Sequence, residues 1–567
     1  MPKTPRPSLP SSDRLLISTV DVVARVEEGV GVLRPALPSS GCASQTRTPG
    51  DPRDSAGPRP VLHIPAVVWI MATILCHLPS LVRPMLDDDE AVYATVAGLM
   101  NAGGRLYASG GVDNKFPGIY WLYALVFRAC GLYAMTAVHL VALAFVLGTA
   151  AVLGSIARTL AGDDRAFGWA ALFYGAFSAS FYPKMLAANT ELFMMLPLAC
   201  SIELGLRGVP RRRDGGGPKH SAPFLTASGG LLVVGCLFKQ VALLNAAVPI
   251  VLIFRRTTGP LRLRSNLALA MGSAIMGAAI FAIVSRTASL DGLWRWAVWS
   301  LLVRYGCQGW SRGTAVRALV AVAGFLGSTV ALNLATARSL RERRGAARDP
   351  LLWSWLVSSA IAVALGGRFF GHYFLQLIAP LSVVAAIQTT RDAQRDPRWG
   401  WRMMALTAFP ASAFSVWALM ADPMTGHLGR PDPDYLALGK RVQALTQPGD
   451  RIFVWGNFAP IYVAAGRLPS TRFVGFLRGL DRGHEAPPEQ AWDVSDAVWT
   501  TLRQEFETRP PAVVIDTSTG NYSDFRAYPP ARFPAVEALI TAGFIERDVV
   551  EGATLYSRRS HDGSPGP

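Results

Sequence analysis

Four consecutive acidic residues, Asp87 to Glu90, form the densest group of chemically capable side chains in this chain. They follow an apolar segment that is long enough to cross a membrane. Later in the same loop, the run Asp113-Asn114-Lys115-Phe116-Pro117 leads into apolar residues again. Carboxylates and a lysine at a membrane surface are costly to desolvate, so they usually mark a functional site. An acid here could accept a proton, and the lysine could hold a phosphate.

The acid run also has a plain structural interpretation. Asp89 and Glu90, followed by Tyr93, precede an expected interfacial helix over Ala91–Asn101. Acidic residues in a first helical turn favour the helix dipole, so they could serve only as caps. Capping alone does not require four acids, and we expect at least one of them to act as a general base.

Two lysines also have both a structural and a functional interpretation. Lys115 and Lys239 each lie at an end of an apolar segment, where a lysine commonly extends its ammonium toward the membrane surface. Lys115 shares its loop with the acid run, which favours a phosphate contact for it. Lys239, in a very short outward connection, is either a snorkelling lysine or another phosphate contact.

A third candidate group is the run from Arg368 to Tyr373, which ends one apolar segment and opens the next. The guanidinium of Arg368 offers a fixed fork of donors suited to phosphate, and His372 and Tyr373 could line a substrate cavity. The alternative is an aromatic belt at the interface. Glu191 in a second outward turn is either part of a helix cap or a contact to a sugar hydroxyl.

The composition indicates a membrane protein with many spans. Of 567 residues, 51% are hydrophobic and only 17% are charged, and the mean hydropathy is +0.28. The net charge of +16 does not indicate nucleic acid, because Arg residues gather in short loops and form no basic face. The six cysteines show no Cys-x-x-Cys spacing, so neither a metal site nor a disulfide framework is indicated.

The apolar segments predict an α-helical polytopic membrane domain with about eleven transmembrane helices. Alternate loops are rich in Arg, and the positive-inside tendency makes that side cytoplasmic. The acidic loop, Glu191, Lys239 and the 368–373 run then all fall on the outer face. The predicted segments are 61–82, 133–157, 166–182, 190–206, 223–238, 240–254, 265–285, 314–336, 351–367, 373–389 and 402–420.

Three regions follow from this pattern. Residues 1–60 are rich in Pro, Ser and Arg and predict a disordered cytoplasmic tail, or sequence upstream of a misassigned start. Residues 61–420 form the membrane domain, with a first external loop over 83–132. Residues 421–567 contain short β-type runs at 451–455 and 512–516 between helical stretches, which predicts a small extracytoplasmic α/β domain.

Together these residues resemble the GT-C integral-membrane glycosyltransferases, in the branch that contains protein O-mannosyltransferases, aminoarabinose transferases and bacterial relatives. Asp89, Glu90 and Tyr93 are similar to that branch's Asp-Glu pair with a Tyr three residues later. Its Asp-x-Lys-Pro-Pro-type element is matched except at its first proline, where Phe116 stands, and its late Arg-aromatic-x-x-His-Tyr element precedes a helix with a proline. The matching residues of these two elements are Asp113, Lys115 and Pro117, and Arg368, Phe369, His372, Tyr373 and Pro380.

The resemblance implies transfer of a sugar from a polyprenyl phosphate to an acceptor, with inversion at the anomeric carbon, at the outer face of the cytoplasmic membrane. It makes Asp89 the base, with Glu90 as substitute or helper. Lys115 and Arg368, with Lys239, would hold the phosphate of the leaving lipid. The acid cluster could hold a divalent ion, although no His or Cys joins it in sequence. The implied partners are the lipid-linked donor and the bilayer, and no nucleic acid is expected.

Two other classes of function stay open. A transporter or flippase of lipid-linked sugars would explain many spans, although no inverted repeat is evident and the acids gather in one external loop. A polysaccharide polymerase or ligase would also use lipid-linked donors. The sugar and its acceptor, whether protein, glycolipid or polysaccharide, do not follow from the sequence.

Overall fold

The computed structural model describes residues 62–180, 183–209, 221–299, 302, 311–342, 349–422, 424, 426–429, 431–475 and 496–559. The predicted tail over 1–60 lies outside these residues. Apolar helices make up the part of the chain before residue 421, and all five strands of the described sheet come after residue 450. The expected fold class, a helical membrane protein with a small C-terminal α/β region, is confirmed.

The long helices follow the apolar segments of the sequence. Most of them overlap the predicted segments, with ends that differ by up to several residues, because a run of apolar residues between polar or Arg-rich ends is what a membrane helix requires. The helices are α1 (Ala66–Val82), α4 (Met135–Ala161), α5 (Arg165–Phe177), α6 (Thr190–Gly208), α7 (Ala222–Phe238), α8 (Ala247–Arg256), α9 (Gly259–Thr287), α12 (Arg312–Ser328), α13 (Val330–Glu342), α14 (Pro350–Ala364), α15 (Leu375–Arg395) and α16 (Pro397–Met420).

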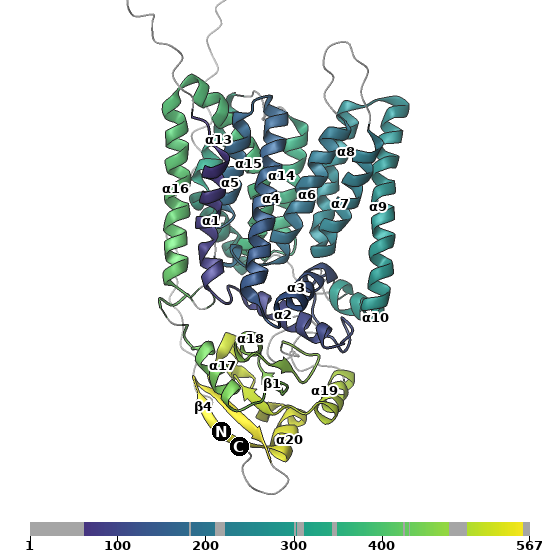
Figure 1. The fold of residues 1–567 in the computed structure, drawn as a ribbon, viewed down its shortest axis with the longest axis vertical. Coiled ribbons are helices and arrows are strands. Elements are labelled where there is room, and N and C mark those ends of the chain that lie inside the picture. The colour runs from purple at the N-terminus through teal and green to yellow at the C-terminus, as the bar shows by residue number, and fades with distance from the viewer. Residues whose placement is uncertain are drawn as a thin grey trace, which may run out of the picture. The chain divides into compact units, whose positions relative to one another are not determined.

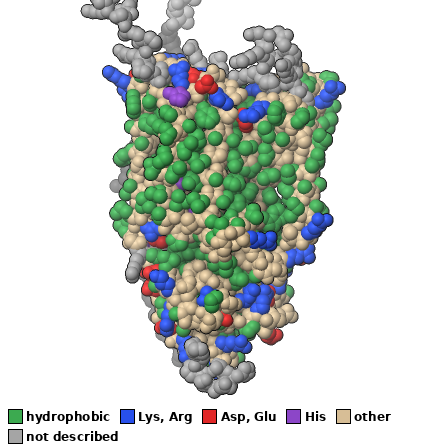
Figure 2. Space-filling view, in the orientation of Figure 1, with side chains coloured by type: hydrophobic (Ala, Val, Ile, Leu, Met, Phe, Trp, Pro, Cys, Tyr) green, Lys and Arg blue, Asp and Glu red, His purple; other side chains and the backbone are tan. Residues whose placement is uncertain are grey.

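Within the described residues, four helical stretches are long and apolar enough to cross a membrane. These are α4, α9, α16 and α15 extended by its short N-terminal turn η5 (Gly371–Phe374), while α1, α7 and α14 are shorter apolar helices. Large hydrophobic side chains on α9, including Leu267, Ile275 and Phe281, are exposed, as expected for a surface that faces lipid. Figure 2 shows hydrophobic side chains covering the helical region. The count of eleven spans stays a prediction.

Two predicted spans differ from the structure. The segment 240–254 begins as the 3-10 helix η2 (Gln240–Ala246) and becomes α-helical only at α8. The segment 314–336 was expected to be one helix, but α12 and α13 meet at Thr329 with a bend of 88°. The hydroxyl of Thr329 donates to the carbonyl of Phe325 at 2.5 Å, and Gly327 and Ser328 come just before it. Gly-Ser pairs and hydroxyls that bond back to the preceding turn are known sites of helix kinks.

Arg-bearing loops that were predicted to share one side meet in the structure. Arg338 of α13 donates to Asp392 of α15 at 2.9 Å, and Arg395 donates to Glu342 at 3.0 Å. Gln394 also donates to Asp163, which lies in the loop between α4 and α5. The ends of α4, α13 and α15 are therefore joined by polar contacts on the same side.

The first loop folds into two short helices at one end of the bundle (Figure 1). Helix α2 (Asp88–Asn101) begins three residues earlier than predicted, because Asp87 caps it by accepting from the amide of Asp89 at 3.4 Å. Helix α3 (Pro117–Cys130) starts at a proline and packs against α2. At 14 residues, α3 is too short to count among the candidate spans.

The C-terminal sheet has the strand order β2-β1-β3-β5-β4. The first three strands, β2 (Leu468–Pro469), β1 (Arg451–Trp455) and β3 (Val513–Asp516), are parallel, whereas β5 (Ala553–Arg558) and β4 (Phe544–Val550) are antiparallel. Helices α17 (Tyr435–Ala444), α18 (Pro460–Ala465), α19 (Asp496–Thr508) and α20 (Pro534–Gly543) connect or precede the strands. The two predicted β runs are β1 and β3, so the alternation of strands and helices predicted this region correctly.

The carboxyl ends of the parallel strands meet the first loop. Helix α18 packs on α2, and Val112 forms an isolated parallel bridge with Phe473. In that bridge the amide of Val112 donates to the carbonyl of Arg472 at 3.1 Å. Backbone pairing of this kind holds the two segments in register, so the loop that carries Asp113 and Lys115 is fixed against the sheet region.

Glu90 anchors the start of α2. Its carboxylate is fully buried and accepts from the amides of Leu86 at 2.8 Å and Ala188 at 2.5 Å, and it lies 3.0 Å from Nε2 of His139 on α4. One side chain thus joins α2 to the chain before it, to the turn before α6 and to α4. A buried carboxylate with three partners holds these segments firmly, because losing it would leave buried donors without acceptors.

We predict that Glu90→Ala lowers the stability of the folded protein by about 2–5 kcal/mol, because it leaves two buried amides and a buried histidine without their acceptor. Thermal unfolding of the purified protein in detergent measures this loss. The matched control is Glu537→Ala, which removes an exposed carboxylate on α20. Equal unfolding temperatures for the two variants would contradict the anchoring role.

Candidate functional site

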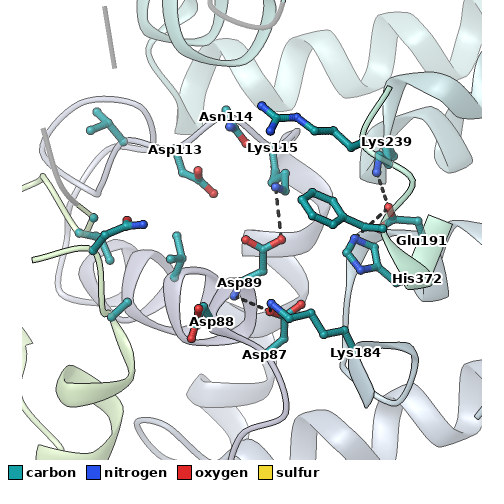
Figure 3. Close-up of a pocket in the computed structure, with 18 of the residues that line it drawn as sticks. Asp87, Asp88, Asp89, Asp113, Asn114, Lys115, Lys184, Glu191, Lys239 and His372 are labelled. Atoms are coloured by element: carbon teal, nitrogen blue, oxygen red, sulfur yellow. Dashed lines mark hydrogen bonds and ion pairs between the residues drawn. The ribbon is translucent and has the colours of Figure 1, made fainter. Parts of the chain in front are cut away.

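A polar cavity of about 260 Å³ lies beside the N-terminus of α2 (Figure 3). Most of the residues predicted from the sequence to form a site line this one cavity, although they come from distant parts of the chain. Those residues are Asp89, Asp113, Lys115, Glu191, Lys239, Arg368, His372 and Tyr373. Glu90 and Tyr93 do not line it. The carboxylate of Glu90 makes the buried contacts described above, and the hydroxyl of Tyr93 donates to Asp89.

Asp89 lies in the middle of the labelled groups (Figure 3). Its Oδ2 accepts from the hydroxyl of Tyr93 at 3.3 Å and lies 3.5 Å from Nζ of Lys115. Burial alone would raise the pKa of Asp89, but Lys115 and Lys184 outweigh it and hold that pKa below its ordinary value. The carboxylate is therefore ionised across the whole neutral range, which is the form that can accept a proton.

Glu191, Lys239 and His372 form a second polar group on another side of Asp89 (Figure 3). Glu191, in the first turn of α6, forms an ion pair with Lys239 and accepts from the hydroxyl of Thr190 at 2.7 Å. Nε2 of His372 lies 3.5 Å from the same carboxylate. The ammonium of Lys239 also lies 3.8 Å from the ring centre of Tyr373, a cation–π contact.

Arg368 reaches the cavity from an unusual loop. Gly366, Gly367 and Phe369 all have positive φ angles, and Phe369 has φ 51°, which is unfavourable for a residue with a side chain. Arg368 lies between these residues and lines the cavity with only 9% of its surface exposed. Two glycines thus allow the tight path that turns the guanidinium inward.

Asp113 and the backbone of Lys115 rest on a group of tyrosines. The hydroxyl of Tyr120 donates to Asp113 at 2.6 Å, and the hydroxyl of Tyr107 donates to the carbonyl of Lys115 at 2.6 Å. The rings of Tyr107, Tyr120 and Tyr93 meet edge to face. Burial raises the pKa of Asp113, against the opposing charge of Lys115.

The sequence reasoning missed Lys184. This lysine comes just before the outward turn at 187–191, at the end of an apolar segment, and a cation there was a usable signal. In the structure it lines the cavity and forms an ion pair with Asp87 at 2.6 Å, and Asp87 also accepts from the side chain of Asn189 at 3.0 Å. Burial raises the pKa of Asp87. Burial alone would lower the pKa of Lys184, but Asp87 and Asp88 outweigh it and raise that pKa.

Residues from the C-terminal region also line the cavity and were not predicted. They follow the carboxyl ends of β1 and β2, and they are Asn457, Ala459, Phe473, Val474 and Gly475. No motif in the sequence marks them, because their position depends on how the sheet region meets the first loop.

A second, apolar cavity of about 430 Å³ adjoins the polar one. Its walls include Phe238 at the end of α7 and Ala362 and Leu365 from the end of α14. Four residues line both cavities: Asn114, Lys115, Lys239 and Tyr373. Two lysines therefore stand where a charged space passes into a hydrophobic one.

The described residues contain no group of three or more His, Cys, Asp and Glu side chains arranged to hold a metal ion. The acid run that could have held a divalent ion is instead distributed among lysine and amide partners: Asp87 pairs with Lys184, Asp89 with Lys115, and Glu90 with backbone amides.

Comparisons with known proteins rest on structure. No protein-family model matches this chain, and no curated protein matches it in sequence. The crystal structure of ArnT from Cupriavidus metallidurans bound to undecaprenyl phosphate superposes with a TM-score of 0.60 and 14% identity, over 88% of this chain and 99% of that one. The same enzyme in the apo state gives a TM-score of 0.59 over the same shares. The chain has the ArnT fold.

The expected type of fold, a helical membrane region with a small C-terminal sheet region, is thereby confirmed. The archaeal oligosaccharyltransferase AglB from Archaeoglobus fulgidus is also similar, with a TM-score of 0.45 and 11% identity over 88% of this chain and 75% of that one. At 14% identity to ArnT the likeness is one of fold.

We predict that Lys184→Met destabilises the protein most at alkaline pH. The change leaves Asp87 buried and ionised without its cation, at a loss of about 2–3 kcal/mol, less than for a fully buried pair because the Lys184 side chain is 28% exposed. The loss should shrink as the pH falls, since a buried carboxyl with a raised pKa can then bind a proton.

Thermal unfolding in detergent at about pH 8 and about pH 5 tests this expectation. The exposed Lys440→Met on α17 is the matched control. A loss of stability that is the same at both pH values would contradict the ion pair as its cause.

Proposed function

We propose that this protein is an inverting glycosyltransferase that moves a sugar from a polyprenyl-phosphate donor to an acceptor at the outer face of the cytoplasmic membrane. The observation that carries the proposal is the junction of the two cavities at Lys115 and Lys239. A polyprenyl phosphate has an anionic head and a long apolar chain. The lysines match the head, and the apolar cavity matches the start of the chain.

The fold supports this assignment of the donor. ArnT of Cupriavidus metallidurans, whose fold this chain shares, was crystallised with undecaprenyl phosphate. A transporter of lipid-linked sugars would also need to bind such a lipid. Asp89, however, lies ionised in the same cavity as the lysines, as a transferase requires.

The proposed reaction is a displacement at the anomeric carbon. Asp89 accepts the proton of the acceptor hydroxyl or amine while the acceptor atom forms its bond to that carbon. The bond from the anomeric carbon to the phosphate oxygen breaks, and its electron pair stays on the phosphate. Lys115, Lys239 and Arg368 stabilise the negative charge that develops on this oxygen, so no proton has to be supplied to the leaving group.

Among the paired acids, Asp89 suits the base role better than Glu90. The Asp89 carboxylate lines the cavity, whereas both oxygens of Glu90 are engaged with buried amides and His139. Help from a second acid would instead come from Glu191, which lines the cavity beside Lys239.

The sidedness of the proposal follows from the Arg-rich loops. They are predicted to be cytoplasmic, which makes the N-terminus cytoplasmic and puts the cavity and the α/β domain outside the inner membrane. The acceptor is a molecule of the cell envelope that carries a hydroxyl or an amine.

We predict that the purified protein, with water in place of the acceptor, slowly hydrolyses a polyprenyl-phosphate sugar to free sugar and polyprenyl phosphate, and that Asp89→Asn lowers this rate by about 10²–10⁴ by removing the base that takes the proton of the water. Lys115→Ala should lower it by about 10²–10³ by removing charge stabilisation. Chromatography of the released lipid measures both rates. The controls are Asp496→Asn, an exposed acid in the first turn of α19, and the exposed Lys440→Ala.

The function would be refuted if the wild-type protein bound the donor lipids and moved them across a vesicle membrane without cleaving any of them. Equal rates for Asp89→Asn and Asp496→Asn would refute the base, while leaving the donor class in place.

A second prediction concerns Asp88, which lines the cavity and is half-buried. Burial raises its pKa to about 6, with Lys184 opposing the rise. Above that pH the ionised Asp88 repels a donor phosphate, and below it the neutral acid does not. We therefore expect the KM for the donor to fall about three- to tenfold between about pH 7.5 and pH 5.

Asp88→Asn should have a low KM at both pH values, because its side chain cannot ionise. A polyprenyl-phosphate sugar is a suitable probe, since a phosphodiester keeps its charge over this range. A KM that varies with pH to the same extent in wild type and Asp88→Asn would exclude Asp88 as the titrating group.

A further inference from the structure

The polar cavity has two distinct ends. One end carries Lys239, Glu191 and His372 and opens toward the apolar cavity, and Asp113 lies on the opposite side of Asp89 (Figure 3). If the donor phosphate stands at the lysines shared with the apolar cavity, its lipid chain leaves on that side. The group on the other side of the phosphate then extends toward Asp113.

The end with Asp113 is closed by the C-terminal region. Val112, the residue before Asp113, pairs with Phe473, and the cavity wall continues through Val474 and Gly475. The hydrogen bond from the amide of Val112 to the carbonyl of Arg472 keeps this wall in register with Asp113. The sheet region therefore contributes directly to the space where the head group beyond the phosphate must lie.

The wall comes from a part of the sheet that suits ligand binding. The chain leaves the parallel strands β1 and β2 at the same edge of the sheet. Strand β2 lies on one side of β1, and the chain then crosses to form β3 on the other side of β1. In open α/β sheets, ligands bind at the carboxyl ends of the strands where the connections diverge in this way. Asn457 lies two residues beyond the end of β1, at this point.

The side-chain amide of Asn457 is suited to hydrogen-bond a sugar hydroxyl. Its side chain is exposed and lines the cavity, and within the described part of the chain no hydrogen bond engages its amide. An amide can both donate and accept, as a sugar hydroxyl does. Next to it Phe473 and Val474 line the cavity, and their burial makes them a firm apolar wall beside the amide.

Gly475 keeps this corner open. A Cβ on Gly475 would lie 3.4 Å from Oδ1 of Asn457, in van der Waals contact. A larger side chain here would therefore fill the space beside the amide, while Lys239 at the other end of the cavity would be untouched.

We infer that Asn457, together with the Phe473–Gly475 segment, binds the hydroxylated ring of the transferred sugar and selects which sugar is accepted. This inference rests on the proposed function, because it takes the lysines as the site of the donor phosphate. The membrane helices then bind the lipid phosphate common to all such donors, and the C-terminal domain distinguishes one sugar from another.

The test compares lipids with and without a sugar. The dissociation constants of undecaprenyl phosphate and of undecaprenyl-phosphate-linked mannose, glucose, galactose and arabinose are measured with the purified full-length protein in detergent, without any acceptor. For the best-bound sugar, Asn457→Ala should weaken binding about five- to tenfold, the effect of one or two lost hydrogen bonds. Binding of undecaprenyl phosphate should not change.

Two further variants sharpen the result. Gly475→Leu should weaken binding of the sugar lipid and spare undecaprenyl phosphate, because it narrows only the corner beside Asn457. Gln504→Ala, which removes an exposed amide from α19 of the same domain, should change neither. Since Asn457 and Gln504 are both exposed, neither substitution disturbs a buried contact.

The outcomes separate this inference from the function on which it rests. Wild-type protein that binds none of these lipids refutes the proposed donor class. Protein that binds undecaprenyl phosphate but shows the same preference for sugar lipids after Asn457→Ala refutes the sugar contact alone. An equal weakening of all the lipids, with or without sugar, also refutes it, because it would assign Asn457 to the phosphate or to the folding of the domain.

Discussion

Ion pairing within a partly buried polar cavity is the constraint on which the rest of this site depends. The three lysines of the cavity each face a carboxylate: Lys115 faces Asp89, Lys184 faces Asp87, and Lys239 faces Glu191. Charges so placed would be costly to bury alone, and their pairing allows both signs to coexist beside a membrane. Under the proposed function, an incoming phosphate would compete with Asp89 for Lys115 and with Glu191 for Lys239, and its binding would weaken these two ion pairs.

The ion pair between Lys184 and Asp87 differs from the other two. Asp87 is deeply buried and is held by Lys184 and Asn189 as well as by its own capping contact to α2. Together with Glu90, it fixes the first turn of the helix that carries Asp89. Adjacent acids in the sequence thus have opposite tasks, since Asp87 and Glu90 hold the helix in place while Asp88 and Asp89 face the cavity.

Much of this arrangement could be predicted from the sequence, because membrane helices and strands follow hydrophobic patterns closely. Most helices of the membrane part and strands β1 and β3 lie near their predicted positions. Asp89, Lys115 and Arg368, which three separate motifs marked as site residues, line one cavity.

The different roles of the four adjacent acids could not be predicted. Successive residues on a helix point in different directions, and which of them meets Ala188 or His139 depends on packing between distant segments. Asn457 was missed for the same reason: its role depends on the contact between the sheet region and the first loop, which no local pattern records. The bend at Thr329 had a local signal in Gly327-Ser328, but a hydrophobic average over the segment conceals it.

The bridge between Val112 and Phe473 has a consequence for how the protein is made. The two residues are separated by most of the chain, so the cavity wall is assembled only after nearly all of the protein has been synthesised and the last domain has docked. Contacts so distant in sequence form late in folding, because a long loop must close first. A nascent or truncated chain would therefore leave Asp89 and Lys115 of the first loop without the cavity wall that the C-terminal region supplies. Dependence on this late contact delays full assembly of the cavity until the molecule is complete.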